Sequence, residues 1–202
     1  MSLTSLNVAN RALTHVGTRQ IASLSDTSKE AQQCNLNYSL SRRAVLRSHF
    51  WNFAMKTVAL GDTERNDQSP VIDYTYSFDI PTDFLRLKSI DDDEVDYQIR
   101  PPAIFTDATQ LNLKYVADIT NVDLWDPMCF EAISLHLAWS ISYVLTQSRE
   151  LKDSLWSSFV TMLKQGKFTD STEDPQVQLD RDDWTRSRFN VTGVFVRDPQ
   201  TW

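Results

Sequence analysis

The stretch "RSHFWNFAMKTVAL", residues 47–60, marks the point where the chain changes structural type. Its first residues end a helical pattern, whereas its last residues read as a strand. Three aromatic residues, Phe50, Trp51 and Phe53, lie where the two patterns meet. Because one buried aromatic ring covers ~150–250 Å², we expect this cluster to hold a helical layer against a sheet. The stretch therefore predicts a chain built in two parts.

Four segments show the 3.6-residue period of helices. The first covers about residues 4–16 and the second about residues 28–49. The third begins at "DPMCFEAISLHLAW" and is apolar over most of its circumference, so we expect it to be the most buried. A break near residues 147–148 introduces the fourth, in which large apolar residues recur at helical spacing.

Residues near the helix ends predict where each helix starts and stops. We expect Thr27 and Glu30 to form a capping box at the start of the second helix. Asp126 is a suitable cap for the third helix, because Pro127 fits the first helical position. Other stop signals are Gly17 after the first helix, and Lys164 and Gly166 at the end of the fourth.

Between the second and third helices the hydrophobic period changes from 3.6 to 2. Four segments alternate apolar and polar residues as half-buried strands do: "VIDYTYSFDIP" (71–81), "FLRLKSI" (84–90), "EVDYQIR" (94–100) and "LNLKYVA" (111–117). No crossover helix fits between them, which predicts antiparallel pairing.

The expected fold class is α+β, mainly α: an antiparallel helical bundle, a small inserted antiparallel β-sheet and an extended C-terminal tail. The expected domains are a helical bundle formed by residues 1–50 and 122–167, an inserted β subdomain at 51–121, and a tail at 168–202.

Composition excludes several classes of function. The 202 residues include four glycines, which disfavours P-loop and Rossmann designs that need clustered glycines around a phosphate. A net charge of −7 argues against general affinity for DNA, although an acidic protein can still let DNA slide past. Cys34 and Cys129 fit no metal-ligand spacing, so we expect buried free thiols.

No catalytic or metal-binding motif is evident in the sequence. The three histidines, His15, His49 and His136, are isolated, and His136 is expected in the core or at an interface. The run "DDDEVD" at 91–96 lacks the glycine and the later Glu of an EF-hand loop, so we interpret it as a solvated turn. We therefore expect no enzyme activity, metal or cofactor.

The apolar stretch from Met128 to Leu145 is a candidate for a membrane span. It contains Glu131 and His136, and an acidic residue near the centre of a bilayer costs ~2.5–3.5 kcal/mol. We therefore expect a helix covered by other helices rather than a membrane span. The N-terminus "MSLTSLNVAN" has no basic segment before an apolar run and predicts no secretion signal.

Two groups of residues are candidates for partner binding. The polar tail contains Trp184, Arg186, Arg188 and Phe189. We expect these residues to anchor the tail on a partner, because Trp and Arg dominate interface energetics. The alternative is that the aromatic residues pack on the chain's own helices. The second group consists of Arg42, Arg43 and Arg47. These arginines can bind phosphate or an acidic surface of a neighbouring subunit, and the acidic balance of the chain favours the second.

Residues 10–60 resemble the N-terminal half of the head-to-tail adaptors of short-tailed bacteriophages, the tail tubular protein A family. Further segments that resemble the family are "YTYSFDIPTDFLRL" at 74–87 and "DDWTRSRF" at 182–189. The third helix matches weakly, and the last thirteen residues are not placed by the resemblance. Within residues 10–60 the shared features are "AL…VG" (Ala12–Gly17), "IASLSD" (Ile21–Asp26), "EA..C" (Glu30–Cys34), Tyr38 with Arg42, and "WNFA" (Trp51–Ala54).

The resemblance implies a helical bundle with a β insertion and a structural role in the virion. It implies a ring, usually of twelve copies, located beneath the portal protein and above the tail nozzle protein, that extends the DNA channel of the tail neck after assembly in the host cytoplasm. It carries over no catalytic residue. Two alternatives remain: a virion-associated cell-wall hydrolase, for which the sequence singles out no carboxylate, and a nucleic-acid binder that uses the arginine cluster.

Overall fold

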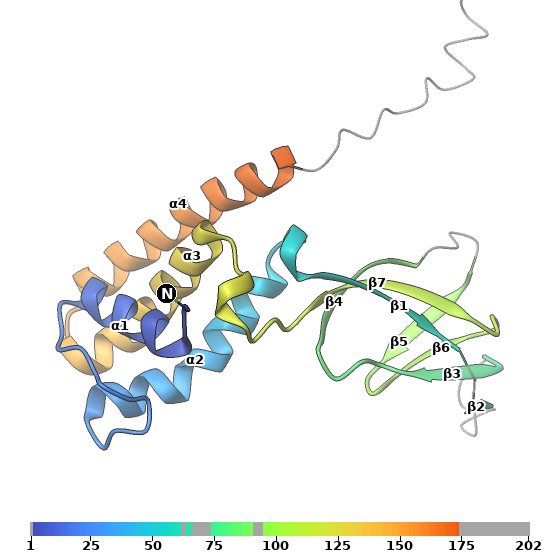
Figure 1. Cartoon of the computed structure of the whole chain (residues 1–202), viewed down its shortest axis with the longest axis horizontal. Helices are drawn as coiled ribbons and strands as arrows, with labels where there is room; N and C mark the ends of the chain where they lie inside the picture. The colour runs from blue at the N-terminus through green and yellow to red at the C-terminus, as the bar shows by residue number, and fades with distance from the viewer. Residues whose placement is uncertain (1, 62–63, 66–73, 91–94, 174–202) are drawn as a thin grey trace, which may run out of the picture. The chain divides into compact units, whose positions relative to one another are not determined.

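The computed structural model describes residues 2–61, 64–65, 74–90 and 95–173 (Figure 1). The contacts within the chain divide it into two units, Met1–Thr172 and Glu173–Trp202. The second unit lies almost wholly outside the described residues. The elements in chain order are α1 (Ser5–Val16), α2 (Lys29–Arg47), the 3₁₀ turn η1 (Asn52–Ala54), β1 (Met55–Leu60), β2 (Glu64–Arg65), β3 (Tyr76–Asp79), β4 (Phe84–Ile90), β5 (Tyr97–Arg100), β6 (Ala103–Thr106), β7 (Leu111–Ala117), the 3₁₀ turn η2 (Val122–Leu124), α3 (Pro127–Thr146) and α4 (Arg149–Glu173).

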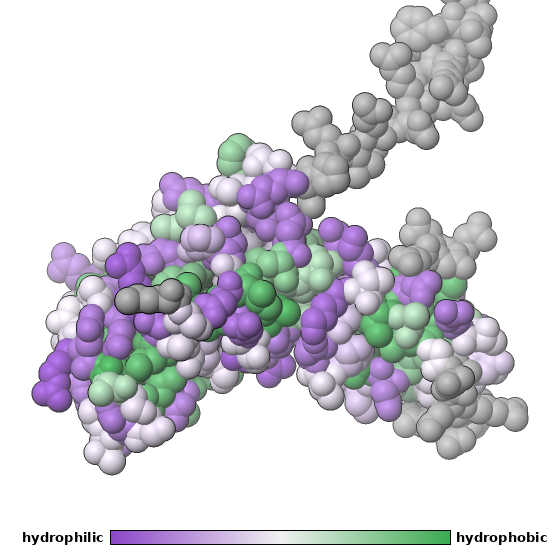
Figure 2. All heavy atoms as spheres, in the orientation of Figure 1, coloured by the Kyte–Doolittle hydropathy of each residue, from purple (hydrophilic) through white to green (hydrophobic). Residues whose placement is uncertain are grey.

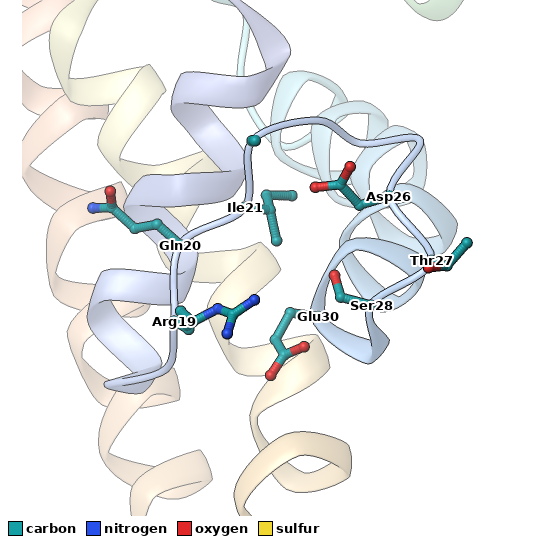
Figure 3. Close-up of a pocket in the computed structure, with 8 residues that line it drawn as sticks. Arg19, Gln20, Ile21, Asp26, Thr27, Ser28 and Glu30 are labelled. Carbon is teal, nitrogen blue, oxygen red and sulfur yellow. The ribbon is translucent and has the colours of Figure 1, made fainter.

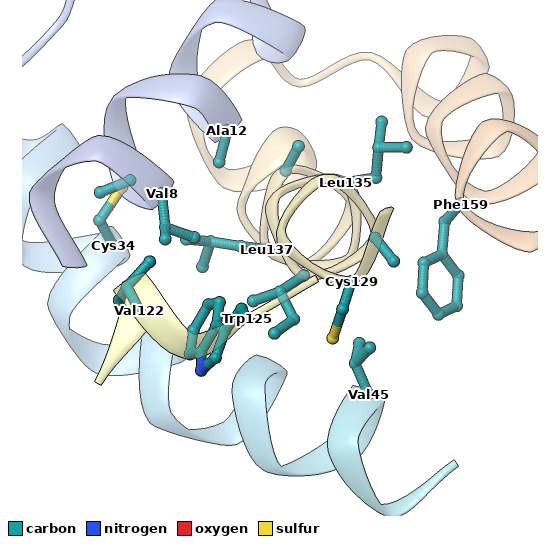
Figure 4. Packing of buried hydrophobic residues seen from close by; sticks show 14 of the residues in the cluster. Val8, Ala12, Cys34, Val45, Val122, Trp125, Cys129, Leu135, Leu137 and Phe159 are labelled. Carbon is teal, nitrogen blue, oxygen red and sulfur yellow. The ribbon is translucent and has the colours of Figure 1, made fainter. Parts of the chain in front are cut away.

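The expected class, α+β and mainly α, is confirmed. Helices α1 and α2 both pack on α3, which buries more residues than any other described helix. Figure 4 shows Val8 and Ala12 of α1 and Val45 of α2 directed at α3. As predicted, Asp126 caps α3 by accepting the backbone N–H of Met128.

Helix α3 has the length and mean hydropathy of a helix that could cross a membrane, and within the described ranges it is the single helix that has them. Half of its apolar window is buried inside the protein. Its Glu131 faces α1, where the carboxylate lies 2.9 Å from Arg11 Nη2 and 2.9 Å from His15 Nε2. Burial acts to raise the pKa of Glu131, but these two partners outweigh it and lower the pKa. The ionised form of Glu131 is therefore the stable one in this setting.

The β part contains two antiparallel sheets rather than the single small sheet that we expected. One sheet has the order β1-β7-β4 and the other the order β2-β3-β6-β5. Their apolar residues form a common cluster, to which Phe78 and Ile104 come from one sheet and Ile90 and Leu113 from the other. The two sheets therefore share a core that is distinct from the cluster between the helices.

The alternating pattern predicted the bounds of two strands and overestimated the length of two others. β4 and β7 have the predicted bounds, whereas β3 and β5 are shorter than predicted. Residues 71–73 and 91–94, which include most of the acidic run, lie outside the described residues. Strand β6 was not predicted. It pairs with both β3 and β5, and the prolines before it hide its pattern from a sequence reading.

Two predicted helix ends were wrong. The N-cap of α2 is Ser28, whose Oγ accepts the backbone N–H of Ala31, and not Thr27. Helix α4 does not close at Lys164 and Gly166 but continues to Glu173, so helical structure extends into the predicted tail, residues 168–202. Gly166 is a helical residue at a close contact: a Cβ on it would lie 3.1 Å from Cη2 of Trp51. Packing, rather than helix termination, accounts for this glycine.

Candidate functional site

The joint between the helices and the sheets is formed by residues 48–55. The chain leaves α2 at Ser48, turns through η1 and enters β1 at Met55. Trp51 is fully buried and donates its indole N–H to the Val45 carbonyl at 3.3 Å. The aromatic cluster of the sequence therefore lies where the two parts meet, as we expected, with Trp51 as its buried member.

The last turns of α4 bind the joint through polar groups. The buried Asp170 accepts the backbone N–H of Asn52 at 3.0 Å, and its carboxylate lies 3.0 Å from His49 Nε2. Asn52 returns a hydrogen bond from its side-chain amide to the Asp170 carbonyl at 3.0 Å. Lys167 donates to the Ser48 carbonyl at 2.9 Å. Asp170 thus acts as a cap for η1 from a distant helix.

Two arginines of the predicted cluster also join the helices to the β part. Arg42 makes a two-pronged contact with Asp118, with Nε and Nη2 at 2.8 and 2.9 Å from the two carboxylate oxygens. These side chains are 12% and 17% exposed. Burial works against the charge of Arg42, but its hydrogen bond with Asp118 raises the pKa overall. Arg47 donates to the Leu85 carbonyl of β4.

The three arginines of the predicted interface cluster therefore differ in their surroundings. Arg42 and Arg47 are engaged within the subunit, whereas the Arg43 side chain is 56% exposed and reaches Asp118 only at 3.7 Å. A role for these arginines between subunits remains a prediction, and Arg43 is the best placed of the three for it.

Arg43 belongs to an outward-facing stripe of α2. Leu36 and Leu40 are 68% and 64% exposed, and with Arg43 they follow the spacing i, i+4, i+7 of one helix face. Most exposed leucines are single and need no explanation. Here two leucines and an arginine share one face of α2, which we call the α2 outer face.

An aromatic cluster joins α3 to α4. The ring centroids of His136 and Phe159 are 5.0 Å apart, and those of Trp139 and Trp156 are 4.8 Å apart. Burial lowers the pKa of His136, and its buried Nδ1 has no hydrogen-bond partner among the residues that the structure describes. His136 is therefore a partly buried residue between α3 and α4 that favours the neutral form.

A cavity of about 360 Å³ lies at the connection that joins α1 to α2 (Figure 3). It is lined by the connection that carries the "IASLSD" motif and by the first residues of α2. Arg19 provides a cation, whereas Asp26 and Glu30 provide carboxylates. The lining therefore favours no single class of charged ligand.

Cys34 and Cys129 are buried free thiols, as expected. Burial raises the pKa of both, that of Cys34 to about 11. Within the described part of the chain, no three His, Cys, Asp or Glu residues are grouped so that they could hold a metal ion. Trp184, Arg186, Arg188 and Phe189 lie outside the described residues, so their predicted docking role stays a prediction.

Sequence reading missed the two most connected acidic residues of the joint, Asp118 and Asp170. Their partners are 76 and 121 residues away, at Arg42 and His49. No local period or spacing marks such a residue. Comparison with protein-family models and with curated proteins found no match for the chain.

Proposed function

We propose that this protein is a structural head-to-tail adaptor of a short-tailed bacteriophage. In this role it forms a ring of twelve copies, the number usual in the resembled family, between the portal protein and the tail nozzle protein. DNA passes through the ring without sequence-specific binding. The protein is assembled in the host cytoplasm and becomes part of the virion neck, with no membrane span, enzyme activity or cofactor.

One observation carries the proposal: the residues of the resemblance occupy structural positions. Trp51 and Ala54 of the "WNFA" motif are fully buried at the joint, and Cys34 is fully buried in α2. Arg42, which follows Tyr38 in the resemblance, holds Asp118 of the β part. These residues hold a helical part and a β part together, which supports a structural rather than a catalytic role for the residues of the resemblance.

The proposal gives separate roles to the parts of the chain. Four helices form an antiparallel bundle as the ring's body, and the extended tail docks on the portal through Trp184, Arg186, Arg188 and Phe189. The net charge of −7 supports a channel from which DNA departs easily, because acidic groups repel phosphates.

The hydrolase alternative gains no support from the described carboxylates. A glycosidase needs a general acid with a raised pKa, whereas Asp83, Asp123 and Glu131, the described carboxylates with clear shifts, have lowered pKa values.

The test is the native mass of the purified chain, alone and mixed with the portal ring of the same virus. Twelve copies of a 23.3 kDa chain would add about 280 kDa to the portal ring. A discrete increment of this order is the expected result. A chain that stays monomeric in both samples would refute the adaptor proposal.

A further inference from the structure

One sheet of the β part concentrates positive charge in a chain whose net charge is −7. The three strands of the sheet β1-β7-β4 contain four Lys and Arg residues and no Asp or Glu. Lys56 of β1 pairs with Asp83. Arg86 and Lys88 of β4 and Lys114 of β7 make no ion pair with any described residue. The sheet therefore carries three cations without a described counter-charge.

Strand register places these cations on the face of the sheet that is turned away from the second sheet. Leu113 and Tyr115 of β7 belong to the core that the two sheets share. Lys114 and Val116 alternate with them and so lie on the opposite face. Val116 packs in the cluster of the helices and is the partner of Arg86 in β4. Because opposite residues of an antiparallel pair share a face, Arg86 lies on the same face as Lys114.

Cations of α2 and α4 extend this charge. The Arg86 guanidinium lies 4.3 Å from the Phe50 ring centroid, and Lys88 Nζ lies 5.7 Å from the same centroid. Arg86 Nη1 also lies 3.5 Å from the Arg47 carbonyl oxygen. Burial and, after it, the positive charge of Arg86 lower the pKa of Lys167. We call this group of cations the basic face: Arg47, Arg86, Lys88, Lys114 and Lys167.

The basic face lacks neutralising groups. Within the part of the chain that the structure describes, Arg47 and Lys167 also make no ion pair, and each donates to a backbone carbonyl. Asp83, Asp118 and Asp170, the carboxylates of adjoining segments, already contact other side chains. Cations that are held close together without a counter-charge attract an anion from outside the chain.

We propose that the basic face binds the phosphate backbone of duplex DNA without reading its sequence. The inference rests on the proposed function and deepens it, because it names the surface of the chain that meets the DNA. Five cations spread over two strands and two helices suit an extended polyanion better than a single small ion. Contacts to phosphate carry no sequence information, which agrees with DNA that moves past the protein.

The other side chains of this face favour a phosphate backbone over a protein partner. The large apolar residues that are exposed in the described chain include none from β1, β4 or β7, whereas a protein interface depends on apolar and aromatic anchors. The hydroxyl groups of Thr57 and Ser89 are exposed beside Lys114, and such groups donate to phosphate oxygens. On the face that Figure 2 displays, hydrophilic side chains reach the surface where the helices meet the sheets.

The aromatic ring of this face favours duplex over single-stranded nucleic acid. Proteins that bind single strands stack the bases on open aromatic rings. Here Arg86 and Lys88 lie over the Phe50 ring, so a base cannot stack on that side. The net charge of −7 repels DNA at long range, and we therefore expect a weak contact that depends strongly on salt.

The first experiment measures binding of the full chain to a labelled random-sequence duplex by fluorescence anisotropy, in a salt series that begins at low salt. The logarithm of the binding constant should fall with the logarithm of salt by about 0.9 for each phosphate neutralised. Arg86→Gln/Lys88→Gln is expected to bind more weakly and to reduce this slope by about 1.8. A wild-type chain that does not bind the duplex at low salt would overturn the inference.

Arg100→Gln/Lys152→Gln is the matched control, because it removes one Arg and one Lys from β5 and α4, outside the basic face. It changes the net charge by the same amount and should leave the slope as in the wild type. Equal slopes for the two double variants would show that only the net charge matters and would reject the basic face.

Lys114→Gln protects the test against misfolding. Among the described residues the Lys114 side chain makes no hydrogen bond or ion pair, so its replacement removes no contact of the fold. We expect a slope reduced by about 0.9, and circular dichroism checks that each variant is folded. A folded Lys114→Gln chain with the wild-type slope would remove β7 from the proposed surface and contradict the inference.

Native mass on the portal ring separates this inference from the proposed function. Weaker DNA binding by Arg86→Gln/Lys88→Gln, together with a normal mass increment, would support both. Unchanged DNA binding with a normal increment would reject the basic face and leave the adaptor role intact. Unchanged DNA binding with loss of the increment would show that the face binds a protein instead. A wild-type chain that binds DNA through this face but stays monomeric with the portal would reject the adaptor role alone.

Discussion

Replacing Arg42 by Met tests whether the Arg42–Asp118 pair holds the helices to the β part. The change removes two charge-assisted hydrogen bonds of 2.8 and 2.9 Å and leaves the Asp118 carboxylate mostly buried. Removing one partner of a buried ion pair lowers the free energy of unfolding by ~3–5 kcal/mol. Because both side chains keep some exposure and Arg43 lies 3.7 Å from Asp118, we expect the lower end of this range, about 3 kcal/mol.

Arg43→Met is the matched control for this prediction. It removes the same group from the same helix and the same carboxylate, but from an exposed contact worth about 0–1 kcal/mol. Urea unfolding followed by tryptophan fluorescence and circular dichroism measures both free energies. The double variant Arg42→Met/Asp118→Leu should recover much of the loss, since replacing a whole buried pair by apolar groups is often neutral. Equal losses for the two single arginine variants would refute the reasoning.

Three further predictions concern the core. Gly166→Val should destabilise the fold by ~1–3 kcal/mol, measured by urea unfolding, because a Cβ there would lie 3.1 Å from Trp51. Since burial lowers the pKa of His136 from 6.5, the unfolded chain binds more protons just below that pH. Stability should therefore fall as the pH drops below 6.5, and His136→Phe should reduce this fall in denaturation curves taken at several pH values. Cys34 and Cys129 should react with a thiol reagent only on unfolding, because burial raises both pKa values; fast labelling of the native chain would contradict this.

Local pattern was sufficient for some elements. The alternation in 84–90 and 111–117 gave β4 and β7 with their observed bounds, and Pro127 after Asp126 gave the start of α3. In these segments the residues that set the conformation are neighbours in sequence. Strand β6 was not predicted, because four residues after two prolines are too few to show a period.

The joint could not be predicted in the same way. A glycine inside a helical pattern can end the helix or allow close packing, and at Gly166 the deciding partner is Trp51, a residue of another segment. Likewise, the sequence places Arg42, Arg43 and Arg47 on one helix, and only the positions of Asp118 and the Leu85 carbonyl separate their contacts. The sequence predicted where the joint lies, but it could not predict which residues contact each other there.

The pairing of β1 with β7 has an evolutionary consequence. Met55, the first residue of β1, lies opposite Val116 near the end of β7. The chain therefore enters and leaves the β part at neighbouring points, and the helical host needs only that short separation to be preserved. Sequence between these points can lengthen, shorten or be exchanged while α2 and α3 keep their places. A lineage could change the proteins that the β part contacts by replacing this segment. The same two chain ends would also accept an engineered insertion.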